Sequence, residues 1–377
     1  MFSFARHSKS KISNWWWTVD KVSFSLAVFL IFIGAMLVLS ASPSAAHRDR
    51  LADDFAFIKK QGVFIFMGLV LMIGVSMQSL RTIRRLAVFG FLCAFAGVVL
   101  TYVVGDATKG AARWIKFAGF SLQPSEFIKP VFIVVTAWLL DANKRIEDFP
   151  GMTLAVGLFL LTALSVFGQP DLGMTVLISG VWALQMVWAG IPVWLIMTLF
   201  SAGLVLVTGS YFFLAHVRDR IDRFLASENE IGSQIQKSMD AFANGNLLGR
   251  GPGEGYVKMT LPDVHTDFIF ALAGEECGVW LTTIIVAAFA AIVVRSMTLS
   301  MRDNNLFVMY AASGLAASLG GQAIVNMCSA LQLMPAKGMT LPFVSYGGSS
   351  MLTSCLAMGM LLAITRKNAA AEDKDNG

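Results

Sequence analysis

Ten separate runs of apolar residues, each about as long as a membrane-crossing helix, constrain this chain more than any other feature. A helix needs roughly 20 apolar residues to cross about 30 Å of hydrocarbon. The runs lie near 22–41, 55–76, 86–105, 126–140, 152–168, 172–189, 192–214, 268–294, 305–332 and 346–365. The sequence therefore predicts an all-α polytopic membrane protein with about ten transmembrane helices.

The composition excludes soluble and disordered proteins. Of the 377 residues, 56% are hydrophobic and only 14% are charged, with a mean hydropathy of +0.67, whereas a soluble domain carries about 25% charged residues. Disordered chains lack an apolar content such as the 29 Phe and 20 Met found here. The formal charge of +5 comes without a basic stripe or a nucleic-acid motif, and it is typical of loops that face anionic lipid.

Positive charge between the runs predicts the orientation, because basic residues of short loops concentrate on the cytoplasmic side. Here they precede the first run and follow the second, fourth, eighth and tenth. These residues are Arg6, Lys9, Lys11, Lys21, Arg81, Arg84, Arg85, Lys144, Arg145, Arg295, Arg302, Arg366 and Lys367. We therefore expect both termini in the cytoplasm, with tails at 1–21 and 367–377 around one membrane domain at 22–366. The tryptophans at 15–17 are expected at the inner interface.

The other loops then face outward, and chemistry is expected there. The longest is a polar segment at about 215–267 between the seventh and eighth helices, and shorter loops lie at 106–125, 168–171 and 333–345.

The first polar cluster lies where an outward loop leads into the fourth helix. It contains Arg113, Lys116, Glu126 and Lys129, and ionisable groups at membrane depth indicate function by default. Glu126 and Lys129 are three residues apart on one helical face. The sequence allows two interpretations of Glu126 and Lys129: a local ion pair, or part of a site in which Lys129 or Arg113 faces an anionic lipid headgroup. Farther on, Asp171 is expected to cap the sixth helix.

The richest polar stretch precedes the eighth helix and carries Lys258, His265, Thr266 and Asp267. Asp267 is expected at the boundary of water and lipid, where partial desolvation favours a general base. Alternatively it caps the eighth helix, and the residue types leave both open. The glycines of this stretch indicate either a flexible turn or a loop that accommodates an anion. They match neither a P-loop nor a dinucleotide-binding motif. A zinc site is not expected, because the chain has only four histidines.

Five motifs in a fixed order carry a resemblance to one family. They are GAARW at 110–114, QPSEFIK at 123–129, QPDLG at 169–173, LPDVHTDFIFALAGEECG at 261–278 and MPAKGMTLPFVSYGGSS at 334–350. Together they resemble the SEDS proteins (shape, elongation, division and sporulation), which are polytopic peptidoglycan glycosyltransferases. The KGMTLPF segment is similar to the cell-division branch rather than the elongation branch, and GPGEGYVKMTLPD is similar to the division proteins of alphaproteobacteria.

The resemblance implies polymerisation of lipid II, an undecaprenyl-pyrophosphate-linked disaccharide pentapeptide, on the outer face of the bacterial inner membrane at the division septum. By motif, Asp267 matches the family's essential carboxylate, and we assign it as general base in an inverting displacement of undecaprenyl pyrophosphate. Glu126 and Lys129 match the family's functional pair. The expected substrate-binding residues are Arg113, Lys116, Glu126, Lys129, Lys258, His265, Thr266 and Lys337.

The resemblance also implies partners and leaves alternatives. The expected partners are a class B penicillin-binding protein with transpeptidase activity, its regulatory subunits and membrane lipids. The sequence contains no ligand set that requires a cofactor, and a divalent cation, Mg or Mn, is an alternative means of neutralising the pyrophosphate. A lipid II flippase, a scaffold of the division machinery and an elongation-type polymerase remain competing functions.

Overall fold

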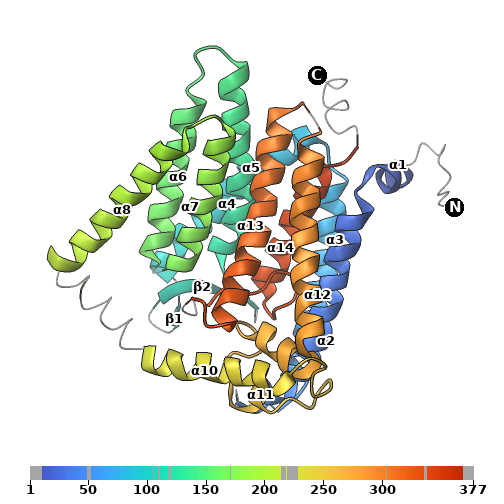
Figure 1. Cartoon of the computed structure of the whole chain (residues 1–377). Helices are drawn as coiled ribbons and strands as arrows, with labels where there is room; N and C mark the ends of the chain where they lie inside the picture. Colours follow the sequence, from blue (N-terminus) through green and yellow to red (C-terminus); the bar gives the residue numbers. More distant parts are fainter. Residues whose placement is uncertain are drawn as a thin grey trace.

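The computed structural model of the chain is a bundle of long helices with a small sheet and a layer of short helices at one end (Figure 1). The structure describes residues 11–48, 52–104, 106–108, 111–117, 120–169, 171–213, 218, 228–302, 304–334 and 338–367. A helix occupies each of the ten predicted runs, which confirms the polytopic helical prediction. These helices are α2 (Lys21–Arg48), α3 (Ala56–Ser76), α4 (Leu80–Val104), α5 (Pro124–Arg145), α6 (Gly151–Gly168), α7 (Leu172–Trp188), α8 (Val193–Phe213), α12 (Ile269–Ser300), α13 (Leu306–Ala330) and α14 (Gly348–Ile364).

Length and composition separate these helices into groups. Six of them, α2, α3, α4, α6, α12 and α13, are long and apolar enough to cross a membrane, and α7 and α14 are apolar but shorter. α5 carries charged side chains at both ends. Large apolar side chains on the outside of the bundle, such as Phe66, Phe89 and Leu164, are about two-thirds exposed. A surface of this kind is stable in hydrocarbon and not in water.

The centre of the bundle is formed by α5, α13 and α14, which pack against one another and against α3 and α4. Phe132, Phe307 and Tyr310 are among its fully buried side chains. Because α5 and α14 both begin at the sheet end, the first residues of two central helices lie at the end of the bundle predicted to face outward (Figure 1).

The loop predicted at 106–125 contains a small sheet, a departure from a purely helical fold. Strands β1 (Asp106–Thr108), β2 (Ala111–Phe117) and β3 (Phe120–Leu122) pair in the order β1-β2-β3, and both pairings are antiparallel. Strands this short contain no apolar run of the length that predicted the helices. The sheet carries Arg113 and Ser121 to the edge of the bundle.

The segment predicted as a long outward loop also contains structure. α10 (Glu228–Gly245) crosses the end of the bundle, and the short α11 (Val257–Thr260) follows it (Figure 1). α10 packs on α12, with the rings of Phe242 and Phe270 5.7 Å apart. The hydroxyl of Ser238 donates a hydrogen bond to the carbonyl of Ala330 (2.7 Å), so polar as well as apolar contacts hold this layer.

The glycine-rich stretch packs against a break in α12. At Gly278 the backbone has φ 72° and ψ −167°, outside the helical region. A Cβ at Gly278 would lie 2.4 Å from the carbonyl oxygen of Leu247. The amide of Val279 donates to the carbonyl of Asn246 (3.1 Å). The glycines therefore permit close backbone packing, and these contacts favour the turn over the anion-accommodating loop.

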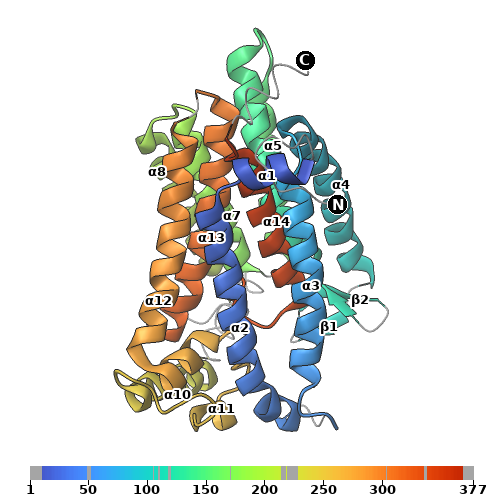
Figure 2. The same cartoon turned by 90° about the vertical axis from the view of Figure 1, so that its right-hand side faces the viewer.

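Arg6 and Lys9 lie outside the described residues. The other basic segments predicted to be cytoplasmic lie at the opposite end, beside α1 (Lys11–Thr18), which lies across the bundle (Figure 2). The alternation of loops between the two ends thus agrees with the predicted topology, and the side that each end faces stays a prediction. Trp16 and Trp17 are exposed, as expected of an interfacial anchor. Trp15 instead is buried and its indole Nε1–H donates to Ser76 Oγ (2.9 Å), because a helix puts adjacent residues on different faces.

Candidate active site

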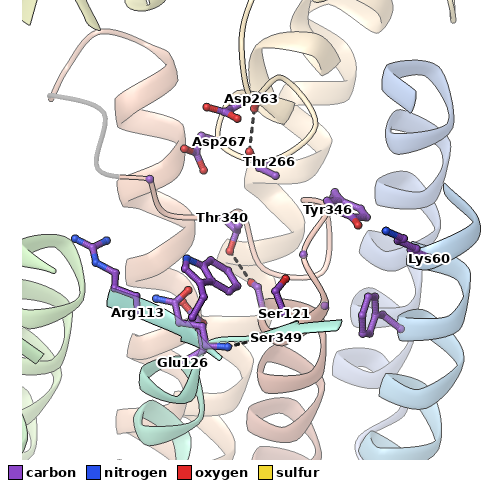
Figure 3. Close-up of a pocket in the computed structure, with 17 residues that line it drawn as sticks. Lys60, Arg113, Ser121, Glu126, Asp263, Thr266, Asp267, Thr340, Tyr346 and Ser349 are labelled. Atoms are coloured by element: carbon purple, nitrogen blue, oxygen red, sulfur yellow. Dashed lines mark hydrogen bonds between the residues drawn. The ribbon is translucent and has the colours of Figure 1, made fainter. Parts of the chain in front are cut away.

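A pocket of about 520 Å³ lies at the sheet end of the bundle, where several of the motifs predicted to face outward come together (Figure 3). Its walls come from α3, β2, β3, the starts of α5 and α14, the turn before α12 and the segment before α14. The lining residues are Lys60, Phe64, Arg113, Trp114, Ser121, Gln123, Glu126, Asp263, Thr266, Asp267, Gly338, Thr340, Tyr346, Gly347, Gly348, Ser349 and Ser350. Besides Asp267, the predicted site residues Arg113, Glu126 and Thr266 therefore line one cavity.

Asp267 belongs to the turn that precedes α12, and its side chain lies beside Asp263 at the pocket (Figure 3). Its backbone amide donates to the carbonyl of Asp263 (3.0 Å), and the amide side chain of Asn326 donates to its carbonyl (2.9 Å). The N-cap of α12 is Phe268, without a side-chain capping hydrogen bond. Of the two alternatives for Asp267, the geometry therefore favours a carboxylate at the pocket over a helix cap.

The segment before α14 holds the Asp267 turn in place. Ser345 Oγ donates to the carbonyl of Thr266 (2.5 Å), and the amide of Tyr346 donates to the carbonyl of His265 (2.8 Å). The two motifs are far apart in sequence, yet each satisfies backbone groups of the other. Buried backbone groups need such partners, so the contacts fix the height of the turn over the pocket.

Two side-chain amides inside α13 support both segments, and sequence reasoning missed them. Asn326 donates to the carbonyls of Asp267 and Met339, and Gln322 donates to the carbonyl of Thr340 (2.9 Å). The signal was available, because two amides four residues apart on one face of an apolar run are unusual at membrane depth.

Glu126 and Lys129 form the ion pair anticipated as one of two alternatives. Lys129 Nζ lies 2.7 Å from Glu126 Oε2 and donates to Gln322 Oε1 (2.5 Å). The two residues are only 8% and 4% exposed. Glu126 lines the pocket, whereas Lys129 lies beneath it. Lys129 therefore neutralises Glu126 and connects α5 to α13 rather than facing the cavity.

Arg113 reaches the pocket from β2 and is oriented by the turn before α7. Its Nη1 lies 3.4 Å from Asp171 Oδ2, and its Nε–H donates to the carbonyl of Gln169 (2.9 Å). Asp171 caps α7 as predicted, accepting from the amide of Met174 (3.1 Å). Burial raises the pKa of Asp171, while the positive charge of Arg113 opposes that shift.

Lys60 on α3 is a second cation at the pocket, and sequence reasoning did not single it out. Figure 3 shows Lys60 and Arg113 on opposite sides of the cavity. Lys60 is exposed, and its side chain makes no hydrogen bond or ion pair with the part of the chain that the structure describes. A second lysine directly after Lys59, at the start of a predicted helix, gave no distinguishing signal in the sequence.

Hydroxyl groups and helix starts complete the wall opposite Asp267. The amide of Gln123 donates to Ser349 Oγ (2.9 Å), which joins the starts of α5 and α14. Thr340 Oγ1 and Ser350 Oγ are 2.5 Å apart. Helix N-termini carry partial positive charge and bind anions, so this wall and Arg113 favour a negatively charged ligand.

Besides Lys129, four predicted site residues are not among those that line the pocket. Lys258 is buried elsewhere, with Nζ 2.8 Å from Glu276 Oε1. The ring of His265 packs against the rings of Phe57 and Tyr346, with centroids 4.6 and 5.3 Å away. Of Lys116 the structure describes the backbone, which pairs with Ser121 in the sheet. Lys337 lies outside the described residues.

The carboxylates at the pocket determine whether a divalent cation could be held there. Among the described residues no group of three or more His, Cys, Asp or Glu side chains is arranged to hold a metal ion. Asp263 and Asp267 nevertheless share one wall. One or two carboxylates together with phosphate oxygens are the usual ligands of Mg²⁺, so the residues present fit a cation that arrives with a pyrophosphate.

Comparison with known proteins identifies relatives over almost the whole chain. The family model described as cell cycle protein, covering FtsW, RodA and SpoVE, matches residues 20–370. A protein of Caulobacter vibrioides named probable peptidoglycan glycosyltransferase FtsW is 40% identical over 369 residues, which cover 98% of this chain and 95% of that protein. The protein of the same name from Geobacter metallireducens is 36% identical over 361 residues, covering 92% and 95%.

Solved structures share the fold. One is a chain from a structure described as "Structural coordination of polymerization and crosslinking by a peptidoglycan synthase complex". It has a TM-score of 0.76 and 25% sequence identity, and the match covers 92% of this chain and 97% of that chain. The Thermus thermophilus rod shape determining protein RodA has a TM-score of 0.69 at 24% identity, covering 93% and 97%. The similarity confirms the polytopic helical membrane fold that the apolar runs predicted.

Proposed function

The chain belongs to the cell cycle protein family of FtsW, RodA and SpoVE, and we propose that it is a peptidoglycan glycosyltransferase that polymerises lipid II into glycan strands for the division septum. The observation that carries the proposal is that Asp267 and Arg113 line the same pocket at the sheet end of the bundle. Resemblance to the division branch and the FtsW names of the relatives support the septal role.

In the proposed reaction Asp267 is the general base. It takes the proton from the 4-hydroxyl of the acceptor sugar while that oxygen attacks the anomeric carbon of the growing strand. The bond from that carbon to the pyrophosphate oxygen breaks on the opposite face, so the configuration inverts in one displacement. One base and a good leaving group are sufficient for such a step.

Arg113 and the starts of α5 and α14 are proposed to stabilise the departing pyrophosphate. Positive groups held in place before the reaction are effective where negative charge develops, and one such donor contributes on the order of 3 kcal/mol. The contacts of Arg113 with Asp171 and Gln169 support this role because they hold the guanidinium in position. Glu126 and Lys129 are proposed to shape the floor, and Lys258 is no longer a candidate for substrate contact.

Two further components complete the proposal. Asp263, the neighbouring carboxylate that does not act as the base, would hold a divalent cation, which would supply additional positive charge. A class B penicillin-binding protein would crosslink the strands, and the solved relative described with both polymerization and crosslinking supports such an assembly.

The test is glycan-strand formation from fluorescent lipid II by the purified chain with its cognate class B transpeptidase. We expect the wild type to make strands and Asp267→Asn to make none, with equal folding and equal complex formation. Asp240→Asn is the matched control, because Asp240 is an exposed carboxylate on α10 that does not line the pocket.

Other outcomes overturn parts of the proposal. Equal polymerisation by Asp267→Asn removes Asp267 as the base. A wild-type complex that translocates lipid II between leaflets and makes no strands favours the flippase. A complex that only recruits an active transpeptidase favours the scaffold.

A further inference from the structure

A second pocket, of about 400 Å³, lies at the end of the bundle opposite the candidate active site. It forms where the turn between α1 and α2 meets the end of α12 and the residues after α14. Figure 2 shows α1 lying across this end beside the upper parts of α2 and α14. Its walls include Trp17, Lys21, Arg295 and Lys367. The proposed reaction uses none of these residues.

The floor of the pocket contains an ion pair whose two charges cancel, and two lysines lie at the rim. Arg295 Nε donates to both carboxylate oxygens of Asp20 (2.8 Å each), and its Nη2 lies 2.7 Å from Asp20 Oδ1. This ion pair satisfies both charges. Lys21 and Lys367 are exposed, and their ammonium groups form no hydrogen bond or ion pair with the described residues. The rim therefore has a net positive charge.

Aromatic rings hold one of the two ammonium groups without using its hydrogen-bond donors. Lys21 Nζ lies 4.6 Å from the ring centroid of Trp17 and 4.9 Å from that of Trp16. Cation–π contacts of this kind act through the ring face, so the N–H groups of Lys21 stay available to an anion.

The same pocket opens onto an apolar helix surface. Val22 lines the pocket and is 47% exposed. Phe29 and Met36 follow at intervals of seven residues, which places them on the same face of α2, and both are exposed. A ligand that satisfies the whole surface needs an anionic head and long apolar chains.

The position of the pocket matches the depth of lipid headgroups. α2 begins at Lys21 and α12 ends at Ser300, so the pocket lies level with the ends of two long apolar helices. Exposed tryptophans, here Trp16 and Trp17, are typical of the membrane interface. Basic pockets at helix ends bind the heads of anionic lipids.

We propose that this pocket is a binding site for an anionic diacyl phospholipid of the leaflet at the α1 end. Lys21 and Lys367 contact the phosphate, and the acyl chains lie along the exposed face of α2 that begins at Val22. The site is independent of the proposed glycosyltransferase activity.

Occupancy of the site has a structural consequence. The amide of Lys367 donates to the carbonyl of Thr18 (3.1 Å), so the pocket joins both ends of the described chain. A ligand that binds only the folded state stabilises it. Bound lipid is thus expected to hold α1 and the end of α14 against α12.

The experiment measures lipid retention and thermal unfolding of the full purified chain. Phosphatidylglycerol retained on the protein is counted by native mass spectrometry, and unfolding is followed in nanodiscs of phosphatidylcholine with and without phosphatidylglycerol. The test variant is Lys21→Gln/Lys367→Gln. The matched control is Lys144→Gln/Arg302→Gln, which removes the same charge from exposed residues at the same end that do not line the pocket.

We expect phosphatidylglycerol to raise the unfolding temperature of the wild type and of the control. The test variant should lose that rise and should retain phosphatidylglycerol at least about tenfold more weakly. Lys21→Arg/Lys367→Arg, which keeps both charges, should restore retention. Equal loss in the control, or an unchanged test variant, overturns the site. Equal stabilisation by inorganic phosphate alone also overturns it, because that result identifies a simple anion site.

Discussion

Lys258 and Glu276 form a buried ion pair that joins the glycine-rich segment before α12 to α12 itself, with Lys258 Nζ 2.8 Å from Glu276 Oε1. Lys258 Nζ also donates to the carbonyl of Gly253 and to Ser40 Oγ (3.1 Å). Every one of these contacts is internal to the protein. Lys258, which the sequence analysis assigned to substrate binding, therefore holds parts of the protein together instead.

Lys258→Met should consequently destabilise the fold. Removing one partner of a buried pair leaves the other charge uncompensated, at a cost of about 3–5 kcal/mol. Thermal unfolding in detergent measures the loss. Lys237→Met serves as control, because Lys237 lies on α10 at the same end of the bundle and its Nζ donates to an exposed carbonyl of Thr260. A variant with normal unfolding and weakened lipid II binding would restore the sequence-based assignment.

Lys60→Met should lower strand formation without lowering stability. An ammonium at the pocket that has no partner among the described residues can contact an anionic substrate, and a hydrogen bond to a charged group is worth about 1.5–3 kcal/mol. We therefore expect kcat/KM for lipid II to fall roughly 10- to 100-fold. The adjacent Lys59 is the control, because it pairs with Asp53 and does not line the pocket. Equal activity of Lys60→Met and Lys59→Met would contradict the prediction.

Asn326→Leu should impair catalysis by releasing the Asp267 turn. The variant loses two hydrogen bonds and leaves the carbonyls of Asp267 and Met339 without this donor. Unsatisfied buried groups cost about 1–3 kcal/mol each. We expect kcat to fall more than KM rises, since the turn carries the base. Ser329→Ala is the control, because the Ser329 hydroxyl donates to the carbonyl of Val325 within α13 and does not hold the Asp267 turn. An unchanged kcat would show that Asn326 does not position the turn.

Stability at low pH should depend on Asp20. Burial alone raises the pKa of this carboxyl, but hydrogen bonds from Arg295 and Ser23 outweigh burial and hold the pKa below its usual value. The unfolded chain then binds the proton more readily. The resulting stability is present above the unfolded pKa of about 3.9 and is lost as pH falls through the folded pKa.

Thermal unfolding of wild type and Asp20→Asn tests this dependence. The variant should unfold at a lower temperature near neutral pH, and the difference from wild type should shrink below about pH 4. A difference that stays constant with pH would show that the charge of Asp20 is not the stabilising element.

The parts of the molecule that the sequence predicted depend on local patterns, and the missed parts depend on contacts between distant segments. Apolar runs predicted the ten helices, and the cap formed by Asp171 followed from its place beside a helix start. The burial of Lys258 depends on Glu276, and the height of Asp267 depends on Asn326 and the segment before α14. No local pattern specifies which distant partner a polar residue meets, so the carboxylate was found and its supports were not.

Gly245→Ala tests whether close backbone packing, rather than flexibility, explains the glycines before the pocket. A Cβ at Gly245 would lie 1.9 Å from the carbonyl oxygen of Gly274, so α10 or α12 must shift. Overpacking of this kind costs about 1–3 kcal/mol, and the unfolding temperature should fall. At Gly180, inside α7, no atom lies within 4 Å of the added carbon. Gly180→Ala should therefore raise stability by about 0.5–1 kcal/mol, the usual gain of alanine over glycine in a helix. Because the two variants add the same methyl group, opposite shifts in unfolding temperature identify packing as the cause, and equal shifts would contradict it.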